Sequence, residues 1–187
     1  MSIANDLNSM NELVKMKDNN KIETFIRLIL QSANKYIVAF RTSYSLGHLL
    51  YFKLRKIVPQ VMLVTNSDQG IYDVLKDINP NDLMIAISFP RYTNLTIDLA
   101  RYVSSRGAKV VSITDGRISP LYKISEECLF CPYKGFTFYN SNVAAMALIN
   151  AIIGRIFNMH YQSAIQNLKK EDQIIEDFNI WFKEKNI

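Results

Sequence analysis

Two stretches of the sequence repeat one order: an apolar run, a short polar loop and a segment with apolar residues at helical spacing. The apolar run 36–40 precedes the loop 41–43, and the run 82–87 precedes the loop 88–93. A short apolar run without alternation is typical of a strand that is buried on both faces. Each stretch therefore predicts a strand, a tight loop and a helix, which are the units of a parallel sheet.

The two polar loops are expected to lie at one edge of that sheet. Loops that follow parallel strands gather at the carboxyl edge, where the N–H groups and the positive dipole of the next helix attract anions. Both loops supply hydroxyl groups, and each carries one arginine. The sequence therefore predicts that they face each other and hold one anionic ligand.

The other elements complete an alternating α/β pattern in one globular domain, which suits a chain of 187 residues with 49% hydrophobic content. Their spacing predicts further helices at 3–16, 22–34, 66–76, 143–157 (headed by Ser141) and 164–182, and further strands at 61–64, 109–114 and 128–131. We expect N-terminal helices over 1–34, a core over 35–158, and a C-terminal amphipathic helix over 159–187 that docks on the core.

The charge pattern argues against nucleic acid as a partner of this chain alone. The formal net charge is +5, but the 22 basic residues are spread along the chain without a Lys/Arg tract. Two cysteines, with no signal peptide and no long apolar span, favour a reducing cytoplasm and no membrane contact.

The two cysteines form a C-x-x-C motif, Cys128 to Cys131. A zinc site would need two more ligands, and His48 and His160 lack ligand spacing, while a redox pair would need a helix N-terminus. Strand alternation instead turns the two thiols to opposite faces, so we expect two separately packed cysteines. No metal, cofactor or catalytic residue is assigned.

A set of short motifs recurs along the chain in a recognisable order. They are Ser43, Ile87-Ser88 and Thr93, the run 106–115, Ser119-Pro120-Leu121, and Ser141 with Ala144 and Ala147. Together they resemble the sugar isomerase (SIS) domain, and more narrowly the sensor half of RpiR/MurR-type bacterial transcription regulators, over about 21–158. The resemblance implies a flavodoxin-like, three-layer αβα fold with a five-stranded parallel sheet that binds phosphosugars, with Ser43, Ser88 and Thr93 as phosphate contacts.

Both loops depart from the family's usual pattern. Arg41 and Arg91 stand where glycine is usual, and Pro90 replaces a serine. A guanidinium binds phosphate or carboxylate with two parallel hydrogen bonds, so this chain is expected to hold its anion by side chains. The predicted ligand contacts are Arg41, Thr42, Ser43, Ser88, Arg91, Tyr92 and Thr93.

Two alternatives stand beside this interpretation. The arginines could be solvated or paired with acids such as Asp115. Ser43 and Thr93 could serve as plain N-caps of the following helices, which is compatible with ligand binding.

Two functions follow from the resemblance. The first is a non-catalytic sensor of a sugar phosphate, which would contact DNA only through a helix-turn-helix domain that is absent from this sequence. The second is a phosphosugar isomerase, which needs a Glu or His base; the candidates are His48, Glu126, Glu127 and His160, and Tyr92 stands where SIS loops often carry an acid. The sequence favours the sensor. The near-continuous hydrophobicity of 143–157 also predicts a homodimer or higher oligomer.

Overall fold

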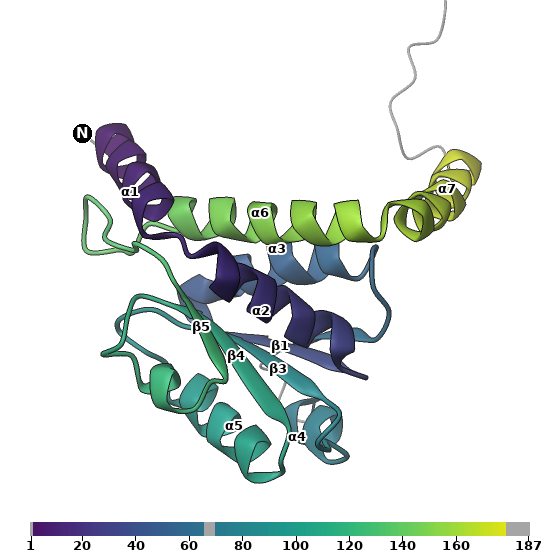
Figure 1. Ribbon diagram of the computed structural model, residues 1–187, viewed down its shortest axis with the longest axis horizontal. Coiled ribbons are helices and arrows are strands. Elements are labelled where there is room, and N and C mark those ends of the chain that lie inside the picture. Colours follow the sequence, from purple (N-terminus) through teal and green to yellow (C-terminus); the bar gives the residue numbers. More distant parts are fainter. Residues whose placement is uncertain (1, 66–69, 179–187) are drawn as a thin grey trace, which may run out of the picture.

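The computed structural model describes residues 2–65 and 70–178, and it has one five-stranded sheet in the order β2-β1-β3-β4-β5 (Figure 1). All four strand pairings are parallel. Each strand lies within one residue of its predicted bounds, which confirms the five-stranded parallel sheet. The strands are β1 (Lys35–Ala39), β2 (Val61–Val64), β3 (Leu83–Ile87), β4 (Lys109–Thr114) and β5 (Glu127–Phe130).

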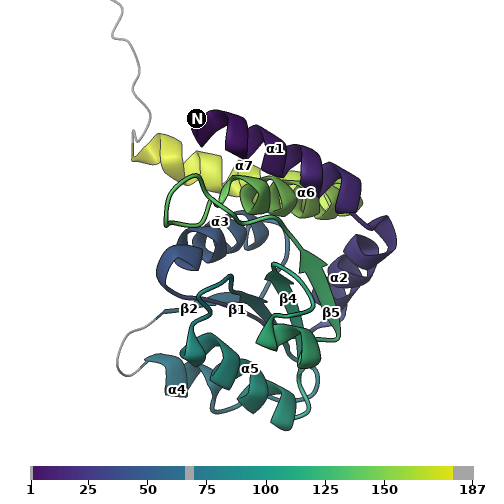
Figure 2. The same cartoon turned by 90° about the vertical axis from the view of Figure 1, so that its left-hand side faces the viewer.

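Helices cover both faces of the sheet because its central strands are apolar on both sides. Every residue of β1 and β3 is buried, and successive residues alternate between two hydrophobic clusters: Ile37 belongs to one and Val38 to the other. Figures 1 and 2 show the three layers that result. One face carries α2 (Asn19–Gln31), α3 (Tyr44–Leu54) and α6 (Val143–Met159), and the other carries α4 (Gly70–Leu75) and α5 (Asn94–Ser105).

The terminal helices lie outside these layers. Helix α1 (Ser2–Met16) packs beside α6, and Leu13 joins the larger core (Figure 2). Helix α7 (Tyr161–Asp177) buries Ala164 in its first turn, but Figure 1 shows it leading away from the sheet at the end of α6. Docking of 159–187 on the core stays a prediction; Ala164 joins the larger core, and Trp181 and Phe182 lie outside the described residues. No helix in the described part is long and apolar enough to cross a membrane.

Local hydrogen bonds explain where helix bounds differ from the predicted ones. Helix α2 begins at Asn19, three residues early, because the Asp18 carboxylate accepts from the N–H groups of Asn20 and Lys21 at 2.9 and 3.3 Å. The apolar spacing of 44–57 predicts a helix up to 57, but α3 ends at Leu54 and the chain continues in turns, in which the N–H groups of Ile57 and Val58 both donate to the Leu54 carbonyl at 3.0 Å. The predicted start of α4 at 66–68 falls outside the described residues.

The two cysteines are free and buried. The Cys128 Sγ lies 3.0 Å from the Ser112 hydroxyl, whereas Cys131 belongs to the hydrophobic cluster under α6. The prediction of two separately packed thiols is confirmed.

Two helical glycines give a matched test of this packing. A Cβ on Gly47 of α3 would lie 2.7 Å from the Ala39 Cβ on β1, whereas a Cβ on Gly154 of α6 would meet nothing within 4 Å. We expect Gly47→Ala to lower the free energy of unfolding by about 1–3 kcal/mol through overpacking. Gly154→Ala should raise it by about 0.5–1 kcal/mol, because alanine has the higher helix propensity. Urea denaturation of both variants measures the difference; equal stabilities would contradict the close contact of α3 with β1.

Candidate functional site

The site lies where the chain reverses its direction of travel across the sheet. From β1 the chain moves outward to β2, then returns to the other side of β1 to form β3. Because Ala39 pairs with Ile87, the loops after β1 and β3 start side by side. Ligands of open parallel sheets bind at such a switch point.

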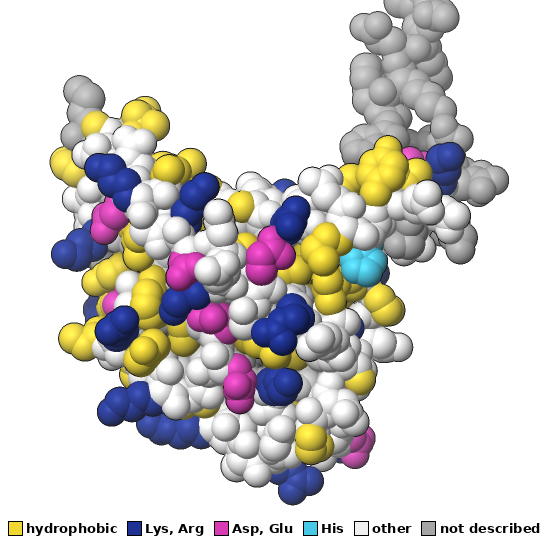
Figure 3. Space-filling model, in the orientation of Figure 1, with side chains coloured by type: hydrophobic (Ala, Val, Ile, Leu, Met, Phe, Trp, Pro, Cys, Tyr) yellow, Lys and Arg dark blue, Asp and Glu magenta, His cyan; other side chains and the backbone are white. Residues whose placement is uncertain are grey.

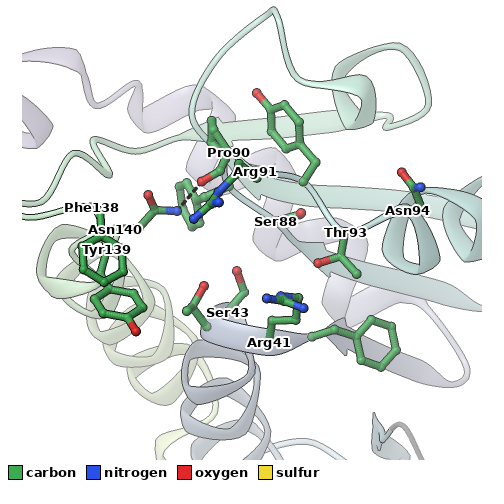
Figure 4. A pocket seen from close by; sticks show the side chains of 14 residues that line it. Arg41, Ser43, Ser88, Pro90, Arg91, Thr93, Asn94, Phe138, Tyr139 and Asn140 are labelled. Atoms are coloured by element: carbon green, nitrogen blue, oxygen red, sulfur yellow. Dashed lines mark hydrogen bonds between the residues drawn. The ribbon is translucent and has the colours of Figure 1, made fainter.

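A cavity of about 370 Å³ opens between the two loops (Figure 4). All seven predicted ligand contacts line it, so the structure brings the predicted residues together. The complete lining is Phe40, Arg41, Thr42, Ser43, Ser88, Phe89, Pro90, Arg91, Tyr92, Thr93, Asn94, Phe138, Tyr139 and Asn140.

The first loop forms a single 3₁₀ turn, Arg41–Ser43, before α3. Arg41 has φ 56°, in the left-handed region that favours glycine. A non-glycine residue there costs roughly 1–3 kcal/mol, so the chain keeps the backbone of a glycine position while placing a guanidinium on it. Figure 4 shows the Arg41 side chain turned into the space between the loops, with Ser43 beside it.

The second loop offers two hydroxyls to the same space. Ser88 is buried, and Thr93 occupies the N-cap position of α5. Neither Thr93 nor Ser43 forms a side-chain capping hydrogen bond, so the alternative that both are plain N-caps is wrong for their side chains. The hydroxyls of Ser43 and Thr93 lie beside the N-termini of α3 and α5, where backbone N–H groups stabilise an anion.

Hydrogen bonds from β4 and from the loop after β5 hold the second loop in place. The Thr114 hydroxyl donates to the Ser88 carbonyl at 2.7 Å, and the Tyr92 hydroxyl donates to Asp115 Oδ1 at 2.8 Å. The Asn140 side-chain amide donates to the Pro90 carbonyl. These contacts come from two separate parts of the chain and hold the wall of the cavity without a ligand.

The contact with Asp115 determines what Tyr92 can do. Burial raises the pKa of the Tyr92 hydroxyl, and the hydrogen bond to Asp115 and the charge of that carboxylate raise the pKa further. The hydroxyl therefore stays protonated and donates its hydrogen to Asp115, so Tyr92 faces a ligand with the rest of its side chain. Among the described residues, no ion pair joins an arginine to Asp115, and this carboxylate accepts from the Tyr92 hydroxyl instead.

The cavity has cationic groups and lacks acidic ones. Within the described part of the chain, neither Arg41 nor Arg91 pairs with a carboxylate, and no lining residue is Asp, Glu or His. Figure 4 shows Arg91 and Arg41 on opposite sides of the space, one from each loop. The arrangement suits an anion, and the lining offers no Asp, Glu or His side chain that could act as a general base.

The four candidate bases lie elsewhere. His48 is on the exposed face of α3, with its ring 6.1 Å from Tyr44 and 6.4 Å from Phe52 between centroids. Glu127 on β5 pairs with Lys21 at 3.5 Å. Glu126 precedes β5, and His160 is the C-cap of α6; neither lines the cavity.

Sequence reasoning missed the contribution of the loop after β5. Phe138, Tyr139 and Asn140 line the cavity, although they are about 50 residues from the second loop in sequence. A signal was present, since the segment 132–139 is rich in aromatic residues and follows a strand whose carboxyl end lies at the same edge.

The fold and cavity define a class, a doubly wound αβα domain with a small-ligand cavity at its switch point. The family model of the SIS domain matches residues 28–155, and the chain belongs to this family.

Individual relatives agree with this assignment. The chain is 36% identical over 110 residues to the "Glutamine--fructose-6-phosphate aminotransferase [isomerizing]" of Pyrobaculum aerophilum; the match covers 59% of this chain and only 18% of that protein. The sugar isomerase domain of an RpiR transcription factor from Sphaerobacter thermophilus is similar in structure, with TM-score 0.88, 22% identity, and 92% and 96% of the two chains covered. The structure of the Vibrio vulnificus NanR protein complexed with ManNAc-6P is also similar, with TM-score 0.76 and 20% identity; the match covers 95% of this chain and 68% of that one.

The raised pKa of Tyr92 predicts a pH-dependent stability. An unfolded tyrosine loses its proton near pH 10, whereas folded Tyr92 keeps its proton above that pH. The folded state then binds more protons, so the free energy of unfolding falls as pH rises above about 10, by at most about 1.4 kcal/mol per pH unit for this group. Tyr92→Phe should be about 1 kcal/mol less stable at neutral pH and decline less steeply above pH 10.

Denaturant titrations of the wild type and of Tyr92→Phe at pH values between about 9 and 11.5 measure how steeply the free energy of unfolding falls with pH in each protein. Tyr102→Phe is the control, because Tyr102 is 42% exposed on α5 and its hydroxyl forms no hydrogen bond within the described structure. The same reduction of slope in both variants would contradict the special role of Tyr92.

Proposed function

We propose that this chain is a non-catalytic SIS domain that binds a sugar phosphate and serves as the effector-sensing part of an RpiR-type transcriptional regulator. Contacts with DNA would then be made by a helix-turn-helix domain outside these residues. The observation that carries the proposal is the cavity itself: two arginines line it together with serine and threonine hydroxyls, and none of its lining residues is an acid or a histidine.

The chemistry of the lining matches a phosphate group. Arg41 and Arg91 can each donate two parallel hydrogen bonds to phosphate oxygens, and Ser43, Ser88 and Thr93 can donate further ones. The structural relatives support the ligand class and the role, since one is an RpiR sugar isomerase domain and another was solved with ManNAc-6P.

The second candidate function is a phosphosugar isomerase. It is favoured by the sequence relative, whose name includes an isomerising activity, but the shared segment is a small fraction of that protein. An isomerase moves a proton between adjacent carbons of an open-chain sugar, which requires a base within hydrogen-bond reach of the ligand. His48 and Glu127 lie outside the cavity lining, so the geometry favours binding without turnover.

One experiment on purified protein separates the two functions. Calorimetry with a panel of aldose and ketose phosphates measures binding, and a coupled assay on the same panel measures turnover. We expect binding of at least one sugar phosphate and no isomerisation. Turnover on the order of one per second or more, abolished by His48→Ala or Glu127→Ala, would establish the isomerase instead.

We also propose that the domain forms a homodimer through its apolar helices. Helix α1 exposes Ile3, Leu7 and Val14 at 76%, 60% and 61%, and Figure 3 shows hydrophobic side chains along this arm of the molecule. Light scattering at micromolar concentration should give a dimer or a higher oligomer. Leu7→Glu should shift it toward monomer, whereas Tyr102→Glu on α5, across the sheet, should not; a wild-type monomer would contradict the proposal.

The arginines give the sharpest prediction for binding. A charge-assisted hydrogen bond contributes roughly 1.5–3 kcal/mol, so Arg91→Ala should weaken sugar-phosphate binding by about tenfold or more. Arg91→Lys should recover only part of the affinity, because lysine keeps the charge and loses the planar fork. Arg41→Gly removes the guanidinium while suiting the φ of 56°, so it should weaken binding without loss of folding.

Calorimetry on these variants and on the double variant measures the coupling of the two arginines. Arg101→Ala is the matched control: this exposed arginine pairs with Asp98 on α5 at 3.3 Å and does not line the cavity. Unchanged affinity in both cavity variants would show that Arg41 and Arg91 are merely solvated.

A further inference from the structure

Two aromatic rings in the loop between β5 and α6 are exposed at the cavity. Phe138 and Tyr139 are 77% and 61% exposed, their centroids lie 4.1 Å apart, and both line the cavity. Figure 4 shows them together at one side of the space, with Thr93 at the other side and the two arginines between. An exposed aromatic surface of this kind can bind the apolar face of a ring.

Hydrogen bonds fix the position of these rings relative to the ligand loops. Asn140, next in sequence, donates to the Pro90 carbonyl, and the Asn142 amide donates to the Thr42 carbonyl at 3.1 Å. On the other side, the Ser141 hydroxyl donates to Asp6 on α1 at 2.6 Å. The loop is thus attached to both walls of the cavity and to α1.

The internal turn of the loop also restricts it. A Cβ on Gly135 would lie 2.1 Å from the Tyr139 carbonyl oxygen, a separation that no side chain could occupy. Only glycine permits this close approach, which brings the chain back onto itself just before the rings. The rings are therefore held on a closed turn rather than on a loose tip.

The arginines and the exposed aromatic rings come from different loops. Both guanidinium groups come from the loops after β1 and β3, whereas Phe138 and Tyr139 come from the loop after β5. A volume of about 370 Å³ is near the lower end of the range for small-ligand sites, which suits one ring and one phosphate.

We infer that the ligand is a sugar phosphate bound in its closed-ring form, with the phosphate at Arg41 and Arg91 and the C–H face of the ring on Phe138 and Tyr139. The inference rests on the proposed function and deepens it. A closed ring presents a rigid apolar face and loses little conformational entropy on binding, whereas an open chain must order several rotatable bonds. The closed ring also masks the carbonyl on which an isomerase would act, in keeping with a sensor.

The test compares each sugar phosphate with its reduced alditol, which keeps the phosphate and the carbon chain but cannot close a ring. The probes are glucose 6-phosphate and N-acetylglucosamine 6-phosphate, each against its own alditol 6-phosphate, measured by calorimetry. In the wild-type protein the ring form should bind about three- to tenfold more tightly for at least one pair, the range expected of one stacking contact. Phe138→Ala and Tyr139→Ala should each reduce this preference by weakening the ring form alone.

Phe136→Ala is the matched control, since Phe136 is 64% exposed on the same loop and does not line the cavity; it should keep the full preference. Arg91→Ala should weaken the sugar and its alditol equally. Circular dichroism of every variant checks that the fold is retained.

Different failures have different meanings. If no phosphate in the panel binds, the proposed function fails and the inference fails with it. If sugars and alditols bind equally, or if the Phe138 and Tyr139 variants keep the wild-type preference, the inference alone is overturned. It is also overturned if these variants change only the oligomeric state in light scattering, or if adenosine 5′-monophosphate binds more tightly than every sugar phosphate.

Discussion

The parallel pairing of β1 with β3 is the constraint on which the site depends. These strands are adjacent in the sheet but not in sequence, and each is buried on both faces. Because a slip of one residue would turn every side chain of a strand toward the opposite layer, the two hydrophobic cores fix the register of Ala39 with Ile87. That register places Arg41 and Arg91 on opposite walls of one cavity, so the packing of the core sets the geometry of the proposed anion site.

Polar contacts then make the cavity walls rigid where apolar packing ends. Thr114 holds the Ser88 carbonyl, Asp115 holds the Tyr92 hydroxyl, and Asn140 holds the Pro90 carbonyl. Thr114 ends β4, Asp115 follows it, and Asn140 lies in the loop after β5, so neighbouring parts of the sheet support a loop that lies beyond it. A ligand entering this cavity does not have to order the second loop, which lowers the conformational cost of binding.

The two loop arginines bear on how such a site can hold an anion. Arg41 has a left-handed φ of 56°, a conformation that favours glycine, yet it carries a guanidinium at the cavity. Small residues let backbone amides approach a phosphate closely, whereas an arginine reaches it from farther away with a planar fork. In the proposed binding mode, side-chain donors take the place of backbone amides in holding the anion.

The sequence by itself determined the five strands, their parallel pairing in one sheet, and the seven residues of the first two loops that line the cavity. It could do so because burial on both faces leaves an apolar run in sequence, and because loops after parallel strands must meet at one edge. Only the tertiary structure decided which polar groups remain available. Ser43 and Thr93 resemble N-caps in sequence yet form no capping bond, and Tyr92 is taken by Asp115, 23 residues away. The aromatic wall at Phe138 and Tyr139 likewise depends on contacts with Pro90 and Thr42, which join residues 50 and 100 positions apart, beyond the reach of any local pattern.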